Sequence, residues 1–118
     1  MVMKTYIYVK AQFAALHQWK QAPNRVNFLR HPHRHIFYVK AKVETIEDRE
    51  QEFFLVQEEL KSIVYDMLEY NPSYAVPTLN RSCEMTAKQI FMEMQKIGYN
   101  IVEVDVSEDD ENGAIYGC

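Results

Sequence analysis

Hydrophobic and polar residues alternate in two stretches of the first half of the chain, residues 5–13 and 37–43. A period of two sends alternate side chains to opposite faces, so each stretch predicts a β-strand with one buried face. The apolar positions are Ile7, Val9, Ala11 and Phe13 in the first strand and Phe37, Val39, Ala41 and Val43 in the second. Between the strands, residues 18–31 lack clean periodicity and contain a Pro-Asn turn signal, which predicts a loop with at most short irregular structure.

Two later stretches repeat apolar residues in steps of three and four, the spacing of an amphipathic helix. Their apolar stripes are Phe53, Val56, Leu60, Ile63, Val64 and Met67, then Ala87, Ile90, Phe91, Met94 and Ile97. Ser82 is a natural N-cap for the second helix, Glu84 lies in its first turn, where the helix dipole favours a carboxylate, and Gly98 is placed to end it. Residues 70–81 contain Asn-Pro and Val-Pro pairs and predict the connection between the helices.

A third strand is predicted where Val102, Val104 and Val106 alternate with acidic residues, and the turn-rich DDENG leads into a short fourth strand at 114–116. The order of elements is therefore β-β-α-α-β-β. Helices segregated from paired strands predict an α+β fold, with one four-stranded antiparallel sheet and two helices on one face. The length and the absence of repeats or linkers predict a single domain over residues 1–118.

Composition narrows the classes of function. A net charge of −4 gives no strong attraction to phosphate backbones or anionic membranes, so we expect no nucleic-acid or membrane partner. No apolar run approaches the roughly 20 residues of a membrane span. Residues 1–13 alternate in character, unlike a signal peptide, so we expect a soluble, cytoplasmic protein. The two cysteines, Cys83 and Cys118, lack the paired spacing of a structural zinc site.

The histidines are the unusual feature, because all 4 lie within residues 17–35 and three fall in the sequence HPHRH. His33 and His35 are two residues apart on a predicted strand, so their side chains share a face. If the first strand stays extended, His17 leaves its apolar face as well. Three histidines with a fourth position open are typical of a catalytic zinc site. Spacing alone leaves the alternative open that this His-rich turn is simply solvated.

Four motifs, in this order, resemble those of one enzyme family. The pattern F-x-A-x-H at residues 13–17, followed by H-x-H at 33–35 running into a strand, resembles 6-pyruvoyl-tetrahydropterin synthase and its bacterial relative, 6-carboxytetrahydropterin synthase. Residues 48–64 are similar to the family's acidic-apolar strand end and following helix. NRSCEMTA resembles its N-P-T-x-E-N-x-A helix opening, with Glu84 at the glutamate and Arg81 where proline is usual. VDVSEDDENGAIY resembles its last hairpin.

The resemblance implies a tunnelling fold, in which sheets of several subunits join edge to edge into a barrel with sites at subunit contacts. It implies a homo-oligomer (a trimer, tetramer or hexamer) and a zinc ion held by His17, His33 and His35. The implied substrate is a pterin or purine-type molecule such as dihydroneopterin triphosphate, with Glu108 pairing with its guanidine-like edge and Glu84 in the same binding site. The implied activity is that of a carbon–oxygen lyase in tetrahydropterin or 7-deazaguanine (queuosine-type) biosynthesis.

The sequence departs from the family's catalytic pattern. The family's catalytic cysteine precedes H-x-H, but residues 18–32 contain neither a cysteine nor an acidic residue, and the family's Asp-His pair after the first helix is missing. His31 is a candidate base, since a free imidazole titrates near neutral pH, and HPH at 31–33 also leaves it open as a metal ligand. The base is therefore unassigned. The alternative function is a non-catalytic metal- and pterin-binding protein of the same fold.

Three other features near the histidines have open interpretations. Lys20, Arg25, Arg30 and Arg34 concentrate positive charge, which suits either a phosphate-bearing substrate or a solvated loop. Trp19 either stacks on a heterocycle or packs on the domain. Cys83 starts the second helix, where we expect a small, semi-buried thiol; the alternative is a thiol whose pKa the helix end lowers.

Overall fold

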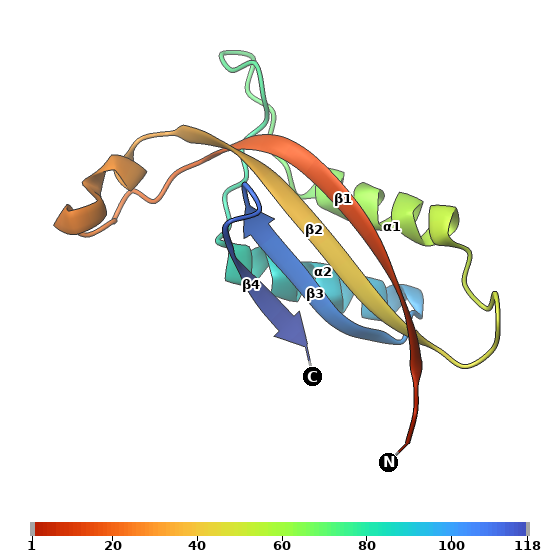
Figure 1. Ribbon diagram of the computed structural model, residues 1–118. Coiled ribbons are helices and arrows are strands. Elements are labelled where there is room, and N and C mark those ends of the chain that lie inside the picture. The colour runs from red at the N-terminus through yellow and green to blue at the C-terminus, as the bar shows by residue number, and fades with distance from the viewer. Residues whose placement is uncertain (1, 118) are drawn as a thin grey trace.

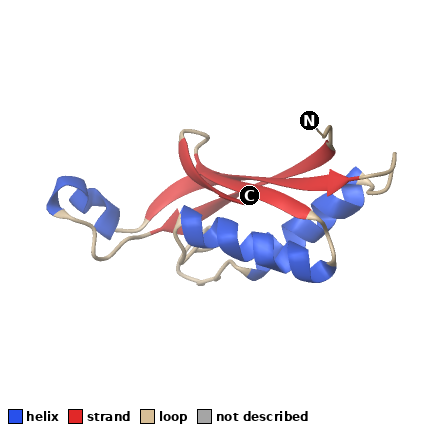
Figure 2. Cartoon of the chain, turned by 90° about the horizontal axis from the view of Figure 1, so that it is seen from below, coloured by secondary structure: helices blue, strands red, loops and turns tan. Residues whose placement is uncertain are grey.

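The computed structural model describes residues 2–117 and has the predicted α+β order. The four strands form one antiparallel sheet in the order β1-β2-β3-β4, and both α-helices cover the same face of it (Figures 1 and 2). A short 3₁₀ helix, η1, lies in the predicted loop. The elements are β1 (Thr5–His17), η1 (Asn24–Arg30), β2 (His33–Thr45), α1 (Phe53–Asp66), α2 (Cys83–Ile97), β3 (Ile101–Glu108) and β4 (Asn112–Gly117).

β1 and β2 form a long hairpin that extends beyond the predicted strands toward the histidines. The two strands pair from Thr5 opposite Thr45 to His17 opposite His33. Alternation continues through Ala15, which is fully buried, so the strand stays extended as far as its last residue. Phe13 lies opposite Phe37, and their rings stack with centroids 5.3 Å apart. The apolar face of the hairpin therefore runs unbroken from the core to the end where the histidines lie.

The helices begin and end near the predicted residues. The Ser82 hydroxyl accepts a hydrogen bond from the Met85 amide at 3.1 Å, and Gly98 ends α2 with a φ of 115°. The expectation that Phe53 and Ile97 belong to the buried stripes was wrong, since both are about half exposed. They are the first residue of α1 and the last of α2, beyond the turns that pack on the sheet.

The prediction of which β3 residues face the core was also wrong at one position. Val104 and Val106 are buried, but Val102 is only partly buried and Ile101 takes the core position instead. The cause is a β-bulge, because the pairing with β2 shifts by one residue between Lys42 and Val43. An extra residue on one strand moves everything beyond it to the opposite face.

The connection between the helices is hydrogen-bonded to the end of β1. The Leu16 amide donates to the Pro77 carbonyl at 2.8 Å, and the Leu79 amide donates to the Leu16 carbonyl at 2.9 Å. Residues 80–82 are thereby held beside the end of the hairpin. As for membranes, no helix within residues 2–117 is both long and apolar enough to span one.

The bulge predicts which of two neighbouring residues supports the core. Ile101→Ala should reduce the free energy of unfolding by about 2–5 kcal/mol, because it empties a buried site. Val102→Ala should cost less than about 1 kcal/mol, because its side chain is only partly buried. Urea denaturation of both variants measures the difference. A larger loss for Val102→Ala would mean that β3 follows uninterrupted alternation.

Candidate metal and ligand site

Three histidines meet at the end of the sheet where β1 ends and β2 begins. His17 lies directly opposite His33 in the hairpin, and His35 follows two residues later on the same face. The ring centroids are 5.9 Å apart for His17 and His33, 4.8 Å for His33 and His35, and 6.5 Å for His17 and His35. Phe37 forms the apolar floor, with its ring 5.7 Å from His17 and 6.0 Å from His35. The structure thus brings together the three predicted ligands.

Each of the three imidazoles uses one nitrogen to contact an oxygen acceptor. Because a carbonyl or a carboxylate can only accept, that ring nitrogen carries the proton, and in a neutral ring the other nitrogen has a free lone pair. The free nitrogens are then Nδ1 of His17 and Nε2 of His33 and His35. The contacts are His17 Nε2 to the Arg81 carbonyl at 3.0 Å, His33 Nδ1 to the His31 carbonyl at 2.8 Å, and His35 Nδ1 to Asp109 Oδ2 at 2.7 Å.

Glu108, at the end of β3, faces two of these free nitrogens. Its Oε1 lies 3.3 Å from His17 Nδ1 and its Oε2 lies 3.4 Å from His35 Nε2. Among the described residues, His35 Nε2 is a buried polar atom that makes no hydrogen bond. A lone pair facing a carboxylate is repelled unless a proton or a cation lies between them. The free nitrogens and Glu108 therefore form a site that a cation would stabilise.

The imidazole and carboxylate donors suit zinc, although the side chains do not have the geometry of a metal-bound site. No group of three or more His, Cys, Asp or Glu side chains within residues 2–117 is positioned to hold a metal ion as it stands. The three histidines do share one face and one end of the sheet. Zinc accepts imidazole nitrogens and carboxylate oxygens, and histidine ligands are usually held by an acceptor on their second nitrogen, as all three are here.

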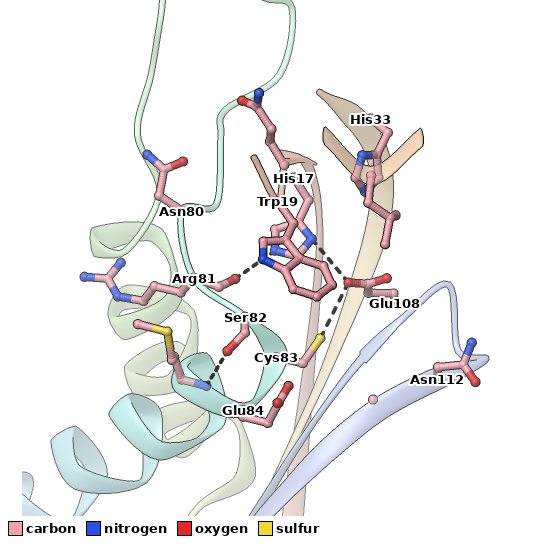
Figure 3. A pocket seen from close by; sticks show the side chains of 14 residues that line it. His17, Trp19, His33, Asn80, Arg81, Ser82, Cys83, Glu84, Glu108 and Asn112 are labelled. Carbon is pink, nitrogen blue, oxygen red and sulfur yellow. Dashed lines mark hydrogen bonds and ion pairs between the residues drawn. The ribbon is translucent and has the colours of Figure 1, made fainter. Parts of the chain in front are cut away.

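A cavity of about 580 Å³ lies beside the histidines, within the size range of small-molecule sites (Figure 3). Its walls come from β1, the loop after it, the start of β2, the first turn of α2 and the β3–β4 hairpin. His17 and Cys83 both contact Glu108 in the cavity wall, and Glu84 lies next to Cys83 in the first turn of α2 (Figure 3). The predicted ring-binding residues therefore line the same cavity as His17 and His33. Trp19 also lines it, as a stacking role requires.

Cys83 is the only cysteine among the described residues, since Cys118 lies outside them, and it is buried. Its Sγ donates to Glu108 Oε1 at 3.9 Å. Burial, and after it the nearby carboxylates of Glu108 and Glu84, raise the pKa of this thiol to about 12. The possibility that the helix end lowers the pKa of this thiol was therefore wrong, because desolvation and the two carboxylates outweigh the helix dipole.

One cationic side chain of the loop between β1 and β2, that of Arg30, stabilises the loop itself. The Arg30 guanidinium donates to the Ala22 carbonyl and to Asn24 Oδ1, both at 2.7 Å. Arg30 therefore has a structural role in the loop. Contact with a phosphate-bearing substrate was one interpretation of the basic residues in the sequence, and this role differs from it. His31 is exposed and does not line the cavity of its own chain, and its role as a base stays a prediction.

Sequence reasoning missed the groups that hold the histidines, among them the His31 carbonyl that accepts from His33 and two others. The first is the Arg81 carbonyl, a backbone acceptor that no residue type signals. The second is Asp109, whose Oδ1 accepts from the Ile36 amide at 2.9 Å while Oδ2 accepts from His35. The Ile36 hydrogen bond and then that of His35 lower the pKa of the Asp109 carboxyl. In the sequence it is one of several acidic residues in SEDDEN, and nothing local separates it from the others.

Comparison with known proteins assigns the chain to a family. Residues 6–118 match the family model described as 6-pyruvoyl tetrahydropterin synthase. The chain belongs to the 6-pyruvoyl tetrahydropterin synthase family. This confirms the resemblance read from the four motifs.

A solved structure shares the fold of this family member. The 6-pyruvoyl tetrahydropterin synthase of Caenorhabditis elegans is similar to it with a TM-score of 0.65 at 18% sequence identity, over 98% of this chain and 96% of that one. At that identity, the likeness shows the fold alone. No curated protein is similar enough in sequence to count as a match.

Cys83 should be inert toward alkylation in the folded protein. In a Cys118→Ser background, iodoacetamide at about pH 8 should modify it at least about 100-fold more slowly in the folded protein than in urea, since the thiolate is the nucleophile. Mass spectrometry of quenched samples measures both rates. Rapid modification of the folded protein would indicate an accessible thiolate and contradict the raised pKa of Cys83.

Proposed function

We propose that this chain is a zinc-dependent member of its family, similar in function to 6-pyruvoyl- and 6-carboxytetrahydropterin synthases. It acts on a pterin or purine-type substrate such as dihydroneopterin triphosphate, in tetrahydropterin or 7-deazaguanine (queuosine-type) biosynthesis. The observation that carries the proposal is the convergence of three histidines, each with one nitrogen held and one free, beside a cavity that contains a carboxylate.

His17, His33 and His35 would hold the metal through their free nitrogens. A zinc ion bound there would supply Lewis acidity, which would acidify the C–H and O–H groups of a substrate side chain. The chain's own contribution is orientation. The Arg81 carbonyl, the His31 carbonyl and Asp109 each fix one ring, so that the three lone pairs are available on the same side of the sheet.

Glu108 would hold the ring. Its side chain lines the cavity, and a planar carboxylate accepts two parallel hydrogen bonds from a guanidine-like edge. Cys83 donates to the same carboxylate and helps to place it. Glu84, in the first turn of α2, adds a second carboxylate to the cavity wall and is the other residue that we assign to substrate binding.

A second candidate is a metal- and pterin-binding protein without lyase activity. The protonated state of Cys83 favours it, because a thiol with a pKa of about 12 cannot take a proton from carbon at neutral pH. The loop at residues 18–32 contains no cysteine or carboxylate to replace it. His31 is the candidate base on the catalytic side.

We also propose that the chain assembles into a homo-oligomer, as a trimer, tetramer or hexamer. β1 and β4 are the two edges of the sheet, and an open edge is stabilised by pairing with another strand. The site opens at the end of β1, so a neighbouring chain paired on that edge would lie close to the cavity. His31 and the exposed Trp19 project from the loop next to this edge.

Incubation of the zinc-loaded protein with dihydroneopterin triphosphate distinguishes the two candidates. The enzyme should release inorganic triphosphate and a modified pterin, and a chelator or His33→Ala should abolish both products. Lys61→Ala, in α1 and not among the residues that line the cavity, is the control and should keep the activity. If no product forms while neopterin still raises the melting temperature, the binding protein is the correct assignment.

Replacing the ring-binding carboxylate should separate ring binding from metal binding. Glu108→Gln should weaken neopterin binding about 10- to 100-fold, because a charge-assisted hydrogen-bond pair is lost. It should leave one zinc per chain, because the three imidazoles that we assign to the metal remain. Glu111→Gln, an exposed residue of the same turn, is the control and should bind neopterin normally. Calorimetric titration measures both ligands. Unchanged neopterin affinity in Glu108→Gln would remove this residue from the ring site.

A further inference from the structure

Asp109 occupies an unusual position between the hairpin turn and the metal-facing histidines. It follows β3 directly, and its backbone amide extends the β2–β3 ladder by donating to the Ile36 carbonyl at 2.7 Å. Its side chain returns to the same strand, where Oδ1 accepts from the Ile36 amide at 2.9 Å and Oδ2 accepts from His35 Nδ1 at 2.7 Å. Three hydrogen bonds therefore join this one residue to two adjacent residues of β2.

These contacts determine which nitrogen of His35 carries the proton. A carboxylate at 2.7 Å from Nδ1 requires an N–H there, so Nε2 of the neutral ring is left with its lone pair. That nitrogen is the buried, unpartnered atom that faces Glu108. Glu108 and Asp109, consecutive in the chain, thus lie against the two opposite nitrogens of one imidazole.

We propose that Asp109 is a positioning residue that locks His35 in the Nδ1–H tautomer and so presents its Nε2 lone pair to a bound metal ion. The role in metal binding rests on the proposed function, whereas the tautomer is a property of the metal-free protein. Asp109 itself does not touch the ion or the substrate. It acts through His35, as carboxylates commonly do toward metal-binding histidines.

The competing explanation is that Asp109 only shapes the turn. Its φ is 53°, in the left-handed region that Asp and Asn tolerate better than most residues, and Asp110 has the same conformation with a φ of 58°. Turn formation alone would make these two residues equivalent. Asp110 is exposed and, within residues 2–117, its side chain accepts no hydrogen bond from a histidine, so it provides a matched control.

The test compares Asp109→Asn with Asp110→Asn in the full-length protein. Asparagine keeps the left-handed turn and one oxygen for the Ile36 amide, but it removes the second carboxylate oxygen that accepts from His35. Long-range ¹H–¹⁵N correlation spectra of the metal-free proteins, at about pH 8 where imidazoles are ordinarily neutral, assign the proton to Nδ1 or Nε2. Competition with a chromophoric chelator gives the zinc affinity.

We expect the wild type and Asp110→Asn to show His35 protonated on Nδ1, and Asp109→Asn to shift the proton toward Nε2. Zinc affinity should fall about 10- to 100-fold in Asp109→Asn alone. The inference is overturned if wild-type His35 carries its proton on Nε2, a result that needs no variant to fold. It is equally overturned if Asp109→Asn and Asp110→Asn show the same tautomer and the same zinc affinity.

Failure of the proposed function has a different signature. If wild-type protein binds no zinc but His35 still changes tautomer in Asp109→Asn, then the metal assignment is wrong and the positioning of His35 by Asp109 is upheld.

Discussion

The register of the β1–β2 hairpin is the constraint on which the site depends. Pairing of Phe13 with Phe37 in the core sets the alignment that places His17 opposite His33 at the end of the hairpin. Because side chains alternate with a period of two, a shift of one residue would turn His17 toward the uncovered face of the sheet. The same buried contacts that stabilise the fold therefore also gather the imidazoles, and His35 shares this face two residues farther along β2.

Elements distant in sequence then hold the histidine rings at the end of the hairpin. The connection before α2 is hydrogen-bonded to the end of β1, which brings the Arg81 carbonyl to His17. The end of β3 supplies Glu108 and Asp109 on either side of His35. The hydrogen bonds from His17 to the Arg81 carbonyl and from His35 to Asp109 each fix the orientation of one ring. The tertiary fold therefore determines which nitrogen of each ring keeps a free lone pair.

Those features that depend on local periodicity could be predicted from the sequence, while those that depend on a distant partner could not. Strand alternation predicted that His17 would share a face with His33 and His35 once β1 stayed extended. The shift of Val102 out of the core depends on how β3 pairs with β2, which no local pattern records. The raised pKa of Cys83 likewise comes from burial and from carboxylates that folding brings near, one of them 25 residues away in the chain.

X-ray absorption at the zinc edge of the purified, zinc-loaded protein tests the account most directly. The predicted spectrum contains only nitrogen and oxygen neighbours at about 2.0–2.2 Å, with the scattering pattern of about three imidazoles, and no sulfur at about 2.3 Å, because Cys83 keeps its proton. Loss of one imidazole in a His17→Ala variant would assign the β1 ligand. A sulfur neighbour in the wild type, or protein that retains no zinc, would contradict the claim that the end of the hairpin is a three-histidine metal site.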